Sequence, residues 1–189
     1  MLNFSSKKST IINILMAVIL LITIINSVYL HIKNQNLKDE DTRQIHYEWY
    51  AVHDMFKIVD KYINSGSKNG EKYTLYVNSV CHHFGSVVSA SKMNVNMHNL
   101  LILSYDPLFS NLAKPEETLN KEEAIELLTK MNSDLLAISK EFVDVNNKPE
   151  DSDLYDQSTS QYSKINAKVE EVSNKYQKLV DDYFKKYKK

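Results

Sequence analysis

An uncharged, apolar run near the start of the chain is the feature that most limits how this sequence can fold. No side chain from Ser9 to Leu30 carries a charge, and the 20 residues from Ile11 to Leu30 are almost all apolar. At about 1.5 Å of rise per residue, a helix of that length spans a hydrocarbon core of roughly 30 Å. We therefore predict a transmembrane signal-anchor helix over residues 9–33, preceded by a short basic tail over residues 1–8.

A cleaved signal peptide and a buried core helix are the two alternatives for this run. The apolar stretch of a signal peptide is usually about 7–15 residues long and ends in a small-x-small site. Here the stretch is longer, and Ile25-Asn26-Ser27 near its end lacks a small first residue. A core helix needs one wide polar face toward water, and Asn13, Thr23, Asn26 and Ser27 do not form one. We expect an anchor that is not cleaved.

The positive-inside rule does not clearly favour either orientation of this anchor, because the numbers of basic residues on its two sides are nearly equal. Lys7 and Lys8 precede the apolar run, and Lys33, Lys38 and Arg43 follow it. A short basic end before an apolar stretch is the layout of a signal-anchor, so we expect the amino end inside and the larger part of the chain outside. Arg43 is the single Arg among 23 Lys and Arg residues, a usage that resembles a low-GC bacterium. We therefore expect a single-pass protein of a bacterial cell membrane with an extracytoplasmic domain.

Composition excludes several other classes of protein. With only 3 Gly and 3 Pro among 189 residues, the chain lacks the turn residues of an all-β fold and the glycines of a phosphate-binding loop. One Cys excludes an intramolecular disulfide framework and a Cys-rich zinc site. A net charge of −1 argues against nucleic acid as a partner.

Apolar residues after the anchor recur at alternating steps of three and four positions. The first series consists of Ile45, Trp49, Val52, Phe56, Val59 and Ile63. Such a seam repeats every 3.5 residues, as in coiled coils and antiparallel bundles. Similar series predict helices at about 38–65, 71–104, 121–146 and 151–187, with an irregular stretch from Tyr105 to Thr118 where Pro107 and Pro115 stand. Asn120 and Glu123 are expected to cap the third of these helices.

Four amphipathic segments joined by short links predict an all-α fold, in which the transmembrane helix is followed by an antiparallel up-down four-helix bundle over residues 38–189. An open three-helix arrangement and a long dimeric coiled coil are the alternatives. In the four-helix topology the last helix returns toward the bilayer. Lys185, Lys186, Lys188 and Lys189 are then expected to contact the membrane surface. Their alternative role is to complement the dipole of the last helix.

Histidines are the residues that hint at metal chemistry. If the first two bundle helices pack antiparallel, His53 could approach His83 or Cys81, and imidazole with thiolate suits Zn²⁺ or Cu⁺. The candidate metal ligands are His53, His83 and His98, and a site built on this helix requires that they converge with Asn94. Neither an H-E-x-x-H motif nor the paired Glu-x-x-His of di-iron bundles occurs. Histidines that are hydrogen-bonded or face solvent are the simpler interpretation, and we expect no cofactor.

Ser91, Asn94 and His98 lie on the inward stripe of the predicted second helix. Buried polar groups must find partners, so these residues either fix the register of the bundle or line a pocket for a ligand or partner. The register is the preferred interpretation. Neighbouring residues on a helix point about 100° apart, so Cys81 and His82 cannot form a nucleophile–base pair, and we predict no catalytic residue.

These expectations favour a membrane-anchored, non-enzymatic interaction, sensory or adaptor module. Its expected partners are the lipid bilayer and a protein, with a second copy in a homodimer as one option. An anchor followed by four helices resembles, in layout, the extracytoplasmic sensory bundles of bacterial chemoreceptors and histidine kinases, a likeness of architecture that assigns no family. The alternative function is a small-ligand or metal-binding bundle built on the polar and histidine stripe of the second helix.

Overall fold

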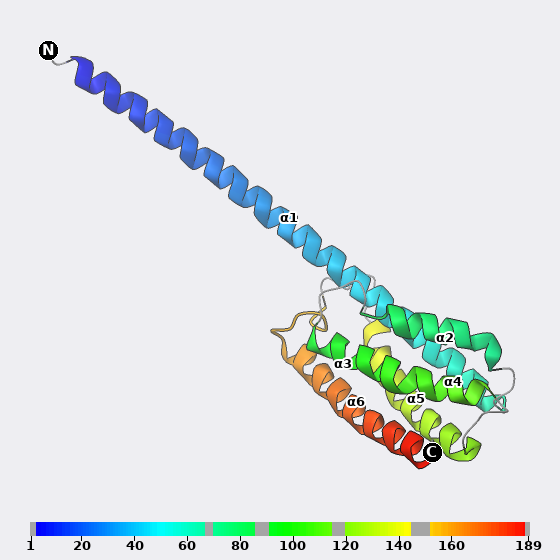
Figure 1. The fold of residues 1–189 in the computed structure, drawn as a ribbon. Coiled ribbons are helices and arrows are strands. Elements are labelled where there is room, and N and C mark those ends of the chain that lie inside the picture. The colour runs from blue at the N-terminus through cyan, green and yellow to red at the C-terminus, as the bar shows by residue number, and fades with distance from the viewer. Residues whose placement is uncertain (1–2, 67–69, 86–90, 115–119, 145–151, 188–189) are drawn as a thin grey trace. The chain divides into compact units, whose positions relative to one another are not determined.

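The computed structural model of the chain describes residues 3–66, 70–85, 91–114, 120–144 and 152–187, and every regular element among them is helical (Figure 1). The elements are α1 (Asn3–Asn64), α2 (Glu71–His83), α3 (Lys92–Leu100), the π-helix η1 (Leu101–Tyr105), α4 (Asp106–Ala113), α5 (Lys121–Val143) and α6 (Ser160–Tyr187). The predicted all-α class is confirmed.

The chain divides into two compact units, Met1–Glu40 and Asp41–Lys189. The first unit holds the amino-terminal part of α1. The most apolar window of this helix has a mean hydropathy of 2.2, and none of that window is buried. The helix is therefore long and apolar enough to cross a membrane, as the sequence predicted.

The core of the second unit is formed by aromatic and aliphatic side chains from all its helices. Trp49 of α1 stacks on Phe142 of α5 with ring centroids 3.9 Å apart, and it meets Phe84 edge-on at 5.1 Å. Phe56 of α1 contacts Tyr105 of η1 edge-on at 5.2 Å. The apolar series predicted on α1 provides one wall of this core, since Trp49, Val52, Phe56 and Val59 are fully buried.

The helix predicted over residues 71–104 is wrong, because the chain reverses direction within it. α2 ends at His83, and Gly85 adopts a φ of +73°, a left-handed conformation that glycine tolerates better than other residues. Contacts of α2 with the following segment run in opposite order: Gly70 approaches Ala113, and Asn78 bonds to Asp106. The predicted second helix is therefore two antiparallel segments, α2 and the continuous run of α3, η1 and α4.

The stretch predicted to be irregular, 105–118, is helical as far as Ala113. Pro107 lacks the N–H that an α-helix interior needs. Directly before it the chain forms the wider π turn of η1, in which the Asp106 N–H bonds to the Leu101 carbonyl. This shift in hydrogen-bond spacing lets the helix continue past the proline.

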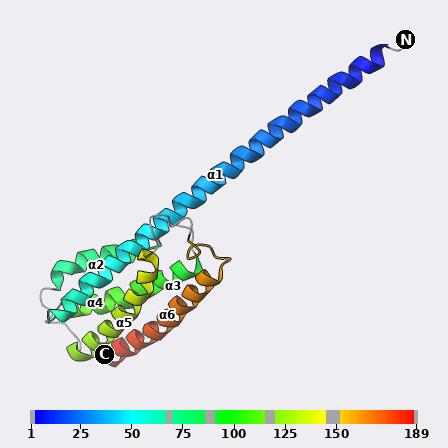
Figure 2. The ribbon, with the colours of Figure 1, turned by 180° about the vertical axis from the view of Figure 1, so that it is seen from behind.

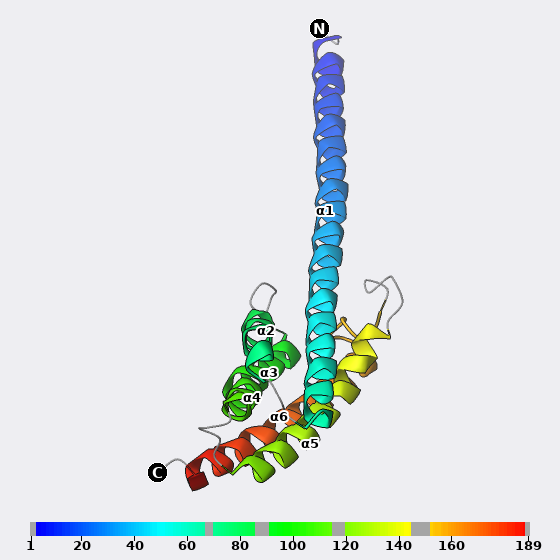
Figure 3. The ribbon, with the colours of Figure 1, turned by 90° about the vertical axis from the view of Figure 1, so that its right-hand side faces the viewer.

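The described part of the second unit therefore contains five helical segments: the end of α1, α2, the α3–η1–α4 run, α5 and α6. α6 packs against α3 and α5, and α4 packs against α2 and α5. Figure 3 shows α2, α3 and α4 grouped on one side of this unit with α5 on the other. The fourth predicted helix also starts later than expected, because residues 152–159 form turns before α6 begins.

The additional reversal changes where α6 ends within this unit. Asn111 near the end of α4 donates to the Tyr183 hydroxyl at 3.0 Å. Tyr62 in the last turns of α1 donates to the Leu112 carbonyl at 3.3 Å. The ends of α1, α4 and α6 therefore lie together, at the end of the unit opposite the entry of the chain at Asp41 (Figure 2).

This arrangement differs from the up-down topology on which the predicted membrane contact of the terminal lysines was based. The prediction required a last helix that runs back toward the point where the anchor enters, whereas α6 runs away from it. Lys186 pairs instead with Glu123 of α5 at 2.9 Å, and Lys185 is exposed in the last turn of α6. Lys188 and Lys189 lie outside the described residues.

Removing the stacked indole should test the core. We expect Trp49→Ala to lower the free energy of unfolding by about 3–5 kcal/mol, because the side chain is fully buried between two aromatic rings. The neighbouring Tyr50 is 50% exposed, so Tyr50→Ala is a matched control that should change it by less than about 0.5 kcal/mol. Chemical denaturation of the full chain in detergent, followed by circular dichroism, measures both. Equal effects would contradict this assignment of the core.

Candidate functional site

A polar junction lies inside the second unit where α2 ends and α3 begins. Its centre is the peptide unit between Phe84 and Gly85, which we call the junction peptide. The N–H of the junction peptide donates to Glu48 Oε2 at 2.8 Å, and its carbonyl accepts from His98 Nδ1 at 2.5 Å. Because a carbonyl oxygen only accepts, the proton of His98 is on Nδ1. These two bonds connect α1, α2 and α3 and satisfy backbone groups at a helix end.

The carboxyl group of Glu48 is partly buried at this junction. Burial raises the pKa of Glu48 above its ordinary value, and the Gly85 N–H and the nearby His98 act in the opposite direction. The geometry gives Glu48 a structural role, because its short hydrogen bond holds the backbone of the reversal.

Ser91 and Asn94 have separate roles at the start of α3. The Ser91 hydroxyl accepts the Asn94 N–H at 3.2 Å, so Ser91 is the N-cap of α3. The Asn94 side chain is only 2% exposed, and neither its Oδ1 nor its Nδ2 has a partner among the described residues. Of the three residues predicted on this stripe, Ser91 and His98 bond to the backbone at the reversal. The Asn94 amide is the one that has no partner among the described residues.

Asn94 belongs to a group of buried polar atoms that share this lack of partners. In the described ranges the others are Trp49 Nε1, Asn96 Nδ2, Tyr162 OH and Asn166 Oδ1. They come from α1, α3 and α6, and the Ser173 hydroxyl of α6 donates to the Asn96 carbonyl at 3.2 Å, which places α6 beside α3. Ordered water is the usual partner of such groups in protein interiors.

The structure does not bring His53, His83 and His98 together, so the prediction that they converge is wrong. His53 Nδ1 lies 2.9 Å from the Ser139 hydroxyl of α5. His83 is exposed, and its Nδ1 bonds to the Ser79 carbonyl of its own helix at 2.7 Å. Among the residues that the structure describes, no group of three or more His, Cys, Asp or Glu could hold a metal ion.

Cys81 is a fully buried thiol on α2. Its Sγ lies 3.7 Å from Met55 Sδ. Burial raises the pKa of Cys81 well above its ordinary value, and the charge of Asp106 adds to the effect. Since the thiolate is the reactive form, this residue acts as a small apolar part of the core.

A buried carboxylate at the start of α4 was missed by the sequence reasoning. Asp106 accepts from Asn78 Nδ2 at 3.0 Å and from the Ser110 hydroxyl at 3.4 Å, and His82 Nε2 lies 3.8 Å away. In a Ser-His-Asp triad the serine bonds to the histidine, whereas here Ser110 bonds to the carboxylate. The group connects α2 to α4 and does not form a nucleophile with its base.

The asparagine that fixes the packing of α5 was also missed. Asn132 is 1% exposed. Its Oδ1 accepts from the Tyr105 hydroxyl at 2.6 Å, and its Nδ2 donates to the Phe56 carbonyl at 3.0 Å. These bonds join α5 to η1 and α1, which is the register role that the sequence analysis assigned to the stripe containing Asn94.

A surface groove of about 430 Å³ lies between α5 and α6. Ile138 and Val172 are its main apolar residues. Lys175 pairs with Asp134 at 2.9 Å, and Lys168 pairs with Glu141 at 3.6 Å. The apolar part of the groove is narrow, since Ile138 is only 5% exposed, and the two ion pairs flank it.

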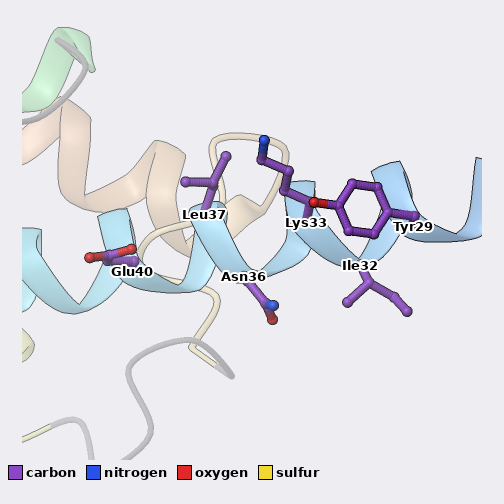
Figure 4. Close-up of a pocket in the computed structure, with 6 residues that line it drawn as sticks. All are labelled: Tyr29, Ile32, Lys33, Asn36, Leu37 and Glu40. Carbon is purple, nitrogen blue, oxygen red and sulfur yellow. The ribbon is translucent and has the colours of Figure 1, made fainter. Parts of the chain in front are cut away.

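The first unit carries a smaller hollow of about 290 Å³ (Figure 4). It is lined by Tyr29, Ile32, Lys33, Asn36, Leu37 and Glu40. All six belong to α1, so no second element closes the hollow. It does not have the concave, enclosed form of a small-molecule site.

Comparison with known proteins gives no relative from which a function could be transferred. No protein-family model, no curated protein and no solved structure matches the chain.

Two buried asparagines provide a matched test of whether the Asn94 amide lacks hydrogen-bond partners. We expect Asn94→Leu to raise the free energy of unfolding by about 1–3 kcal/mol, because it removes an amide without partners. Asn132→Leu should lower it by a similar amount, because it leaves the Tyr105 hydroxyl and the Phe56 carbonyl unpaired. Denaturation of the two variants and the parent chain measures the difference. A loss of stability in Asn94→Leu would contradict this expectation and would show that the amide is not an unpaired group.

Acidification should destabilise the second unit through its histidines. Burial lowers the pKa of His46 and His53 below 6.5, so the unfolded chain takes up these protons first as the pH falls. Their contribution is complete above about pH 6.5 and decreases below it. The raised pKa of Glu48 has the opposite effect, because it favours the folded state as the pH falls. This effect is the same in the parent chain and in a variant that keeps Glu48, so it cancels when the two are compared.

We therefore expect His53→Gln to lose less stability than the parent chain between pH 7 and about pH 5.5. Urea denaturation at the two pH values measures the difference. Identical pH dependence in the two proteins would contradict a lowered pKa for His53.

Proposed function

We propose that this chain is a single-pass protein of a bacterial cell membrane whose second unit is a non-enzymatic interaction domain outside the cytoplasm. The observation that carries the proposal is the exposed apolar surface of the first unit. From Ile14 to Leu37 its large apolar side chains are exposed on all sides of α1. Water contact with that surface costs about 25 cal/mol per Å², and a bilayer removes it.

The use of polar groups in the second unit supports binding over catalysis. Glu48 and His98 hold the junction peptide, Asp106 joins α2 to α4, and Cys81 is buried with a raised pKa. The groove between α5 and α6 offers an apolar strip with charged edges. These features support a protein partner at the surface of a helical bundle.

A second candidate function is the binding of a small polar ligand inside the second unit. The observation that favours it is the unpartnered Asn94 amide, together with the other buried polar atoms of α1, α3 and α6 that lack partners among the described residues. Asn94→Leu gains stability if the amide has no partner, and it loses stability if a polar molecule, ordered water included, bonds to the amide. A gain in stability would therefore contradict a ligand at Asn94.

Membrane topology provides the direct test of the proposed function. The full chain is expressed in bacterial cells with Cys81→Ala and one new cysteine, Ser133→Cys, at an exposed position of α5. We expect the chain to remain in membranes after extraction with alkaline carbonate. We also expect a membrane-impermeant thiol reagent to label it in intact cells, because the second unit lies outside.

The two parts of the proposal fail in different ways. Release of the chain by carbonate would contradict the membrane anchor. Retention in membranes with labelling only after lysis would contradict the extracytoplasmic location and leave the anchor intact. Cys81→Ala without the new cysteine is the control for background labelling.

A further inference from the structure

Polar side chains inside the apolar run of α1 differ in whether they find a partner. The Thr23 hydroxyl donates to the Ile19 carbonyl of its own helix at 2.8 Å. The Asn26 side chain is exposed, and its amide forms no hydrogen bond with any other described residue. A carboxamide has two N–H donors and an oxygen acceptor, so Asn26 presents a larger unmet hydrogen-bonding demand than Thr23.

The depth of Asn26 makes this demand important. It stands four residues before Leu30, the end of the apolar run, which is about 6 Å along the helix axis. The hydrocarbon offers no water to pair with the amide. The short side chain lacks the flexible stem by which a lysine reaches the head groups. Another helix in the bilayer can supply the partner that this amide lacks.

We propose that Asn26 pairs α1 with the α1 of a second copy of this chain. Two carboxamides can bond to each other reciprocally, since each supplies both a donor and an acceptor. Copies inserted with the same orientation place Asn26 at the same depth, so a two-fold axis brings each amide to the group it needs. Polar side chains at this depth are a known source of association between membrane helices.

The face that carries Asn26 is compatible with this pairing. Ile19, Ile22 and Leu30 lie at helical spacings of seven, four and four residues from Asn26 and give the face an apolar surface. Lys33 follows seven residues after Asn26, and Figure 4 shows it on the same side of α1 as Tyr29. The lysine stem lets its ammonium group turn toward the head groups, so the two lysines of a dimer need not face each other.

Energy transfer between fluorescent copies of the full chain measures the association. The chains are reconstituted in vesicles of phosphatidylethanolamine and phosphatidylglycerol and diluted with increasing lipid. We expect Asn26→Val to weaken association by roughly 3- to 30-fold. Asn26→Gln, which keeps the carboxamide, should retain most of it. Ser27→Ala is the matched control and should leave it unchanged, because a serine hydroxyl can bond to the carbonyl one turn earlier.

Oxidative cross-linking in the same vesicles tests the face. In a Cys81→Ala background, Ile19→Cys lies two turns from Asn26 on the proposed face and should form dimers. Val28→Cys lies on the opposite face and should form fewer. Equal cross-linking at both positions would contradict the proposed face.

The proposed pairing rests on the proposed membrane anchor, and the outcomes of these experiments distinguish a failure of the pairing from a failure of the anchor. If Asn26→Val stays in the membrane and associates as strongly as the parent chain, the pairing is overturned and the membrane anchor is not contradicted. Absence of self-association in the parent chain would do the same and would point to a different membrane helix as the partner. A chain that does not insert into vesicles would overturn the anchor itself.

Discussion

The path of the chain through the second unit depends on one partly buried peptide unit, the junction peptide between Phe84 and Gly85. A helix end that is buried leaves backbone groups without partners unless side chains supply them. Glu48 accepts the N–H and His98 donates to the carbonyl of this unit. Trp49 packs edge-on against Phe84, so apolar and polar contacts hold the reversal at the same place. The direction of α3 and α4, and through them the position of α6, follows from this reversal.

Features encoded by local patterns could be predicted from the sequence. The apolar spacing on α1 identified its buried face, and the Asn120 side chain accepts the Glu123 N–H at 3.4 Å as a cap. The reversal was missed although Gly85 is a stop signal, because the apolar series on both sides of it fits one helix. Pro107 was interpreted as a break, but a shift to π-helical spacing accommodates it. That shift is a backbone adjustment that side-chain periodicity does not encode.

The polar residues show a further limit of local patterns. Asn94 and Asn132 are the same residue type at similarly buried positions, yet Asn132 has two partners from distant segments and Asn94 has none among the described residues. Only the packing of α5 on α1 and η1 distinguishes them. On the one continuous helix that was predicted, His83 and His98 would lie about 22 Å apart along the axis. The reversal instead leaves His83 exposed and brings His98 to the junction peptide.

The two units use apolar side chains in opposite ways, and charged residues mark the change. In the first unit they face outward, which suits hydrocarbon, and in the second they face inward. The boundary falls between Glu40 and Asp41, within the charged stretch Lys38-Asp39-Glu40-Asp41. Such charges are costly in hydrocarbon and in a protein core alike, so neither environment can extend across them. In the second unit several interior polar groups hold the protein's own backbone. Recognition of a partner would then fall to surface side chains such as those of the α5–α6 groove.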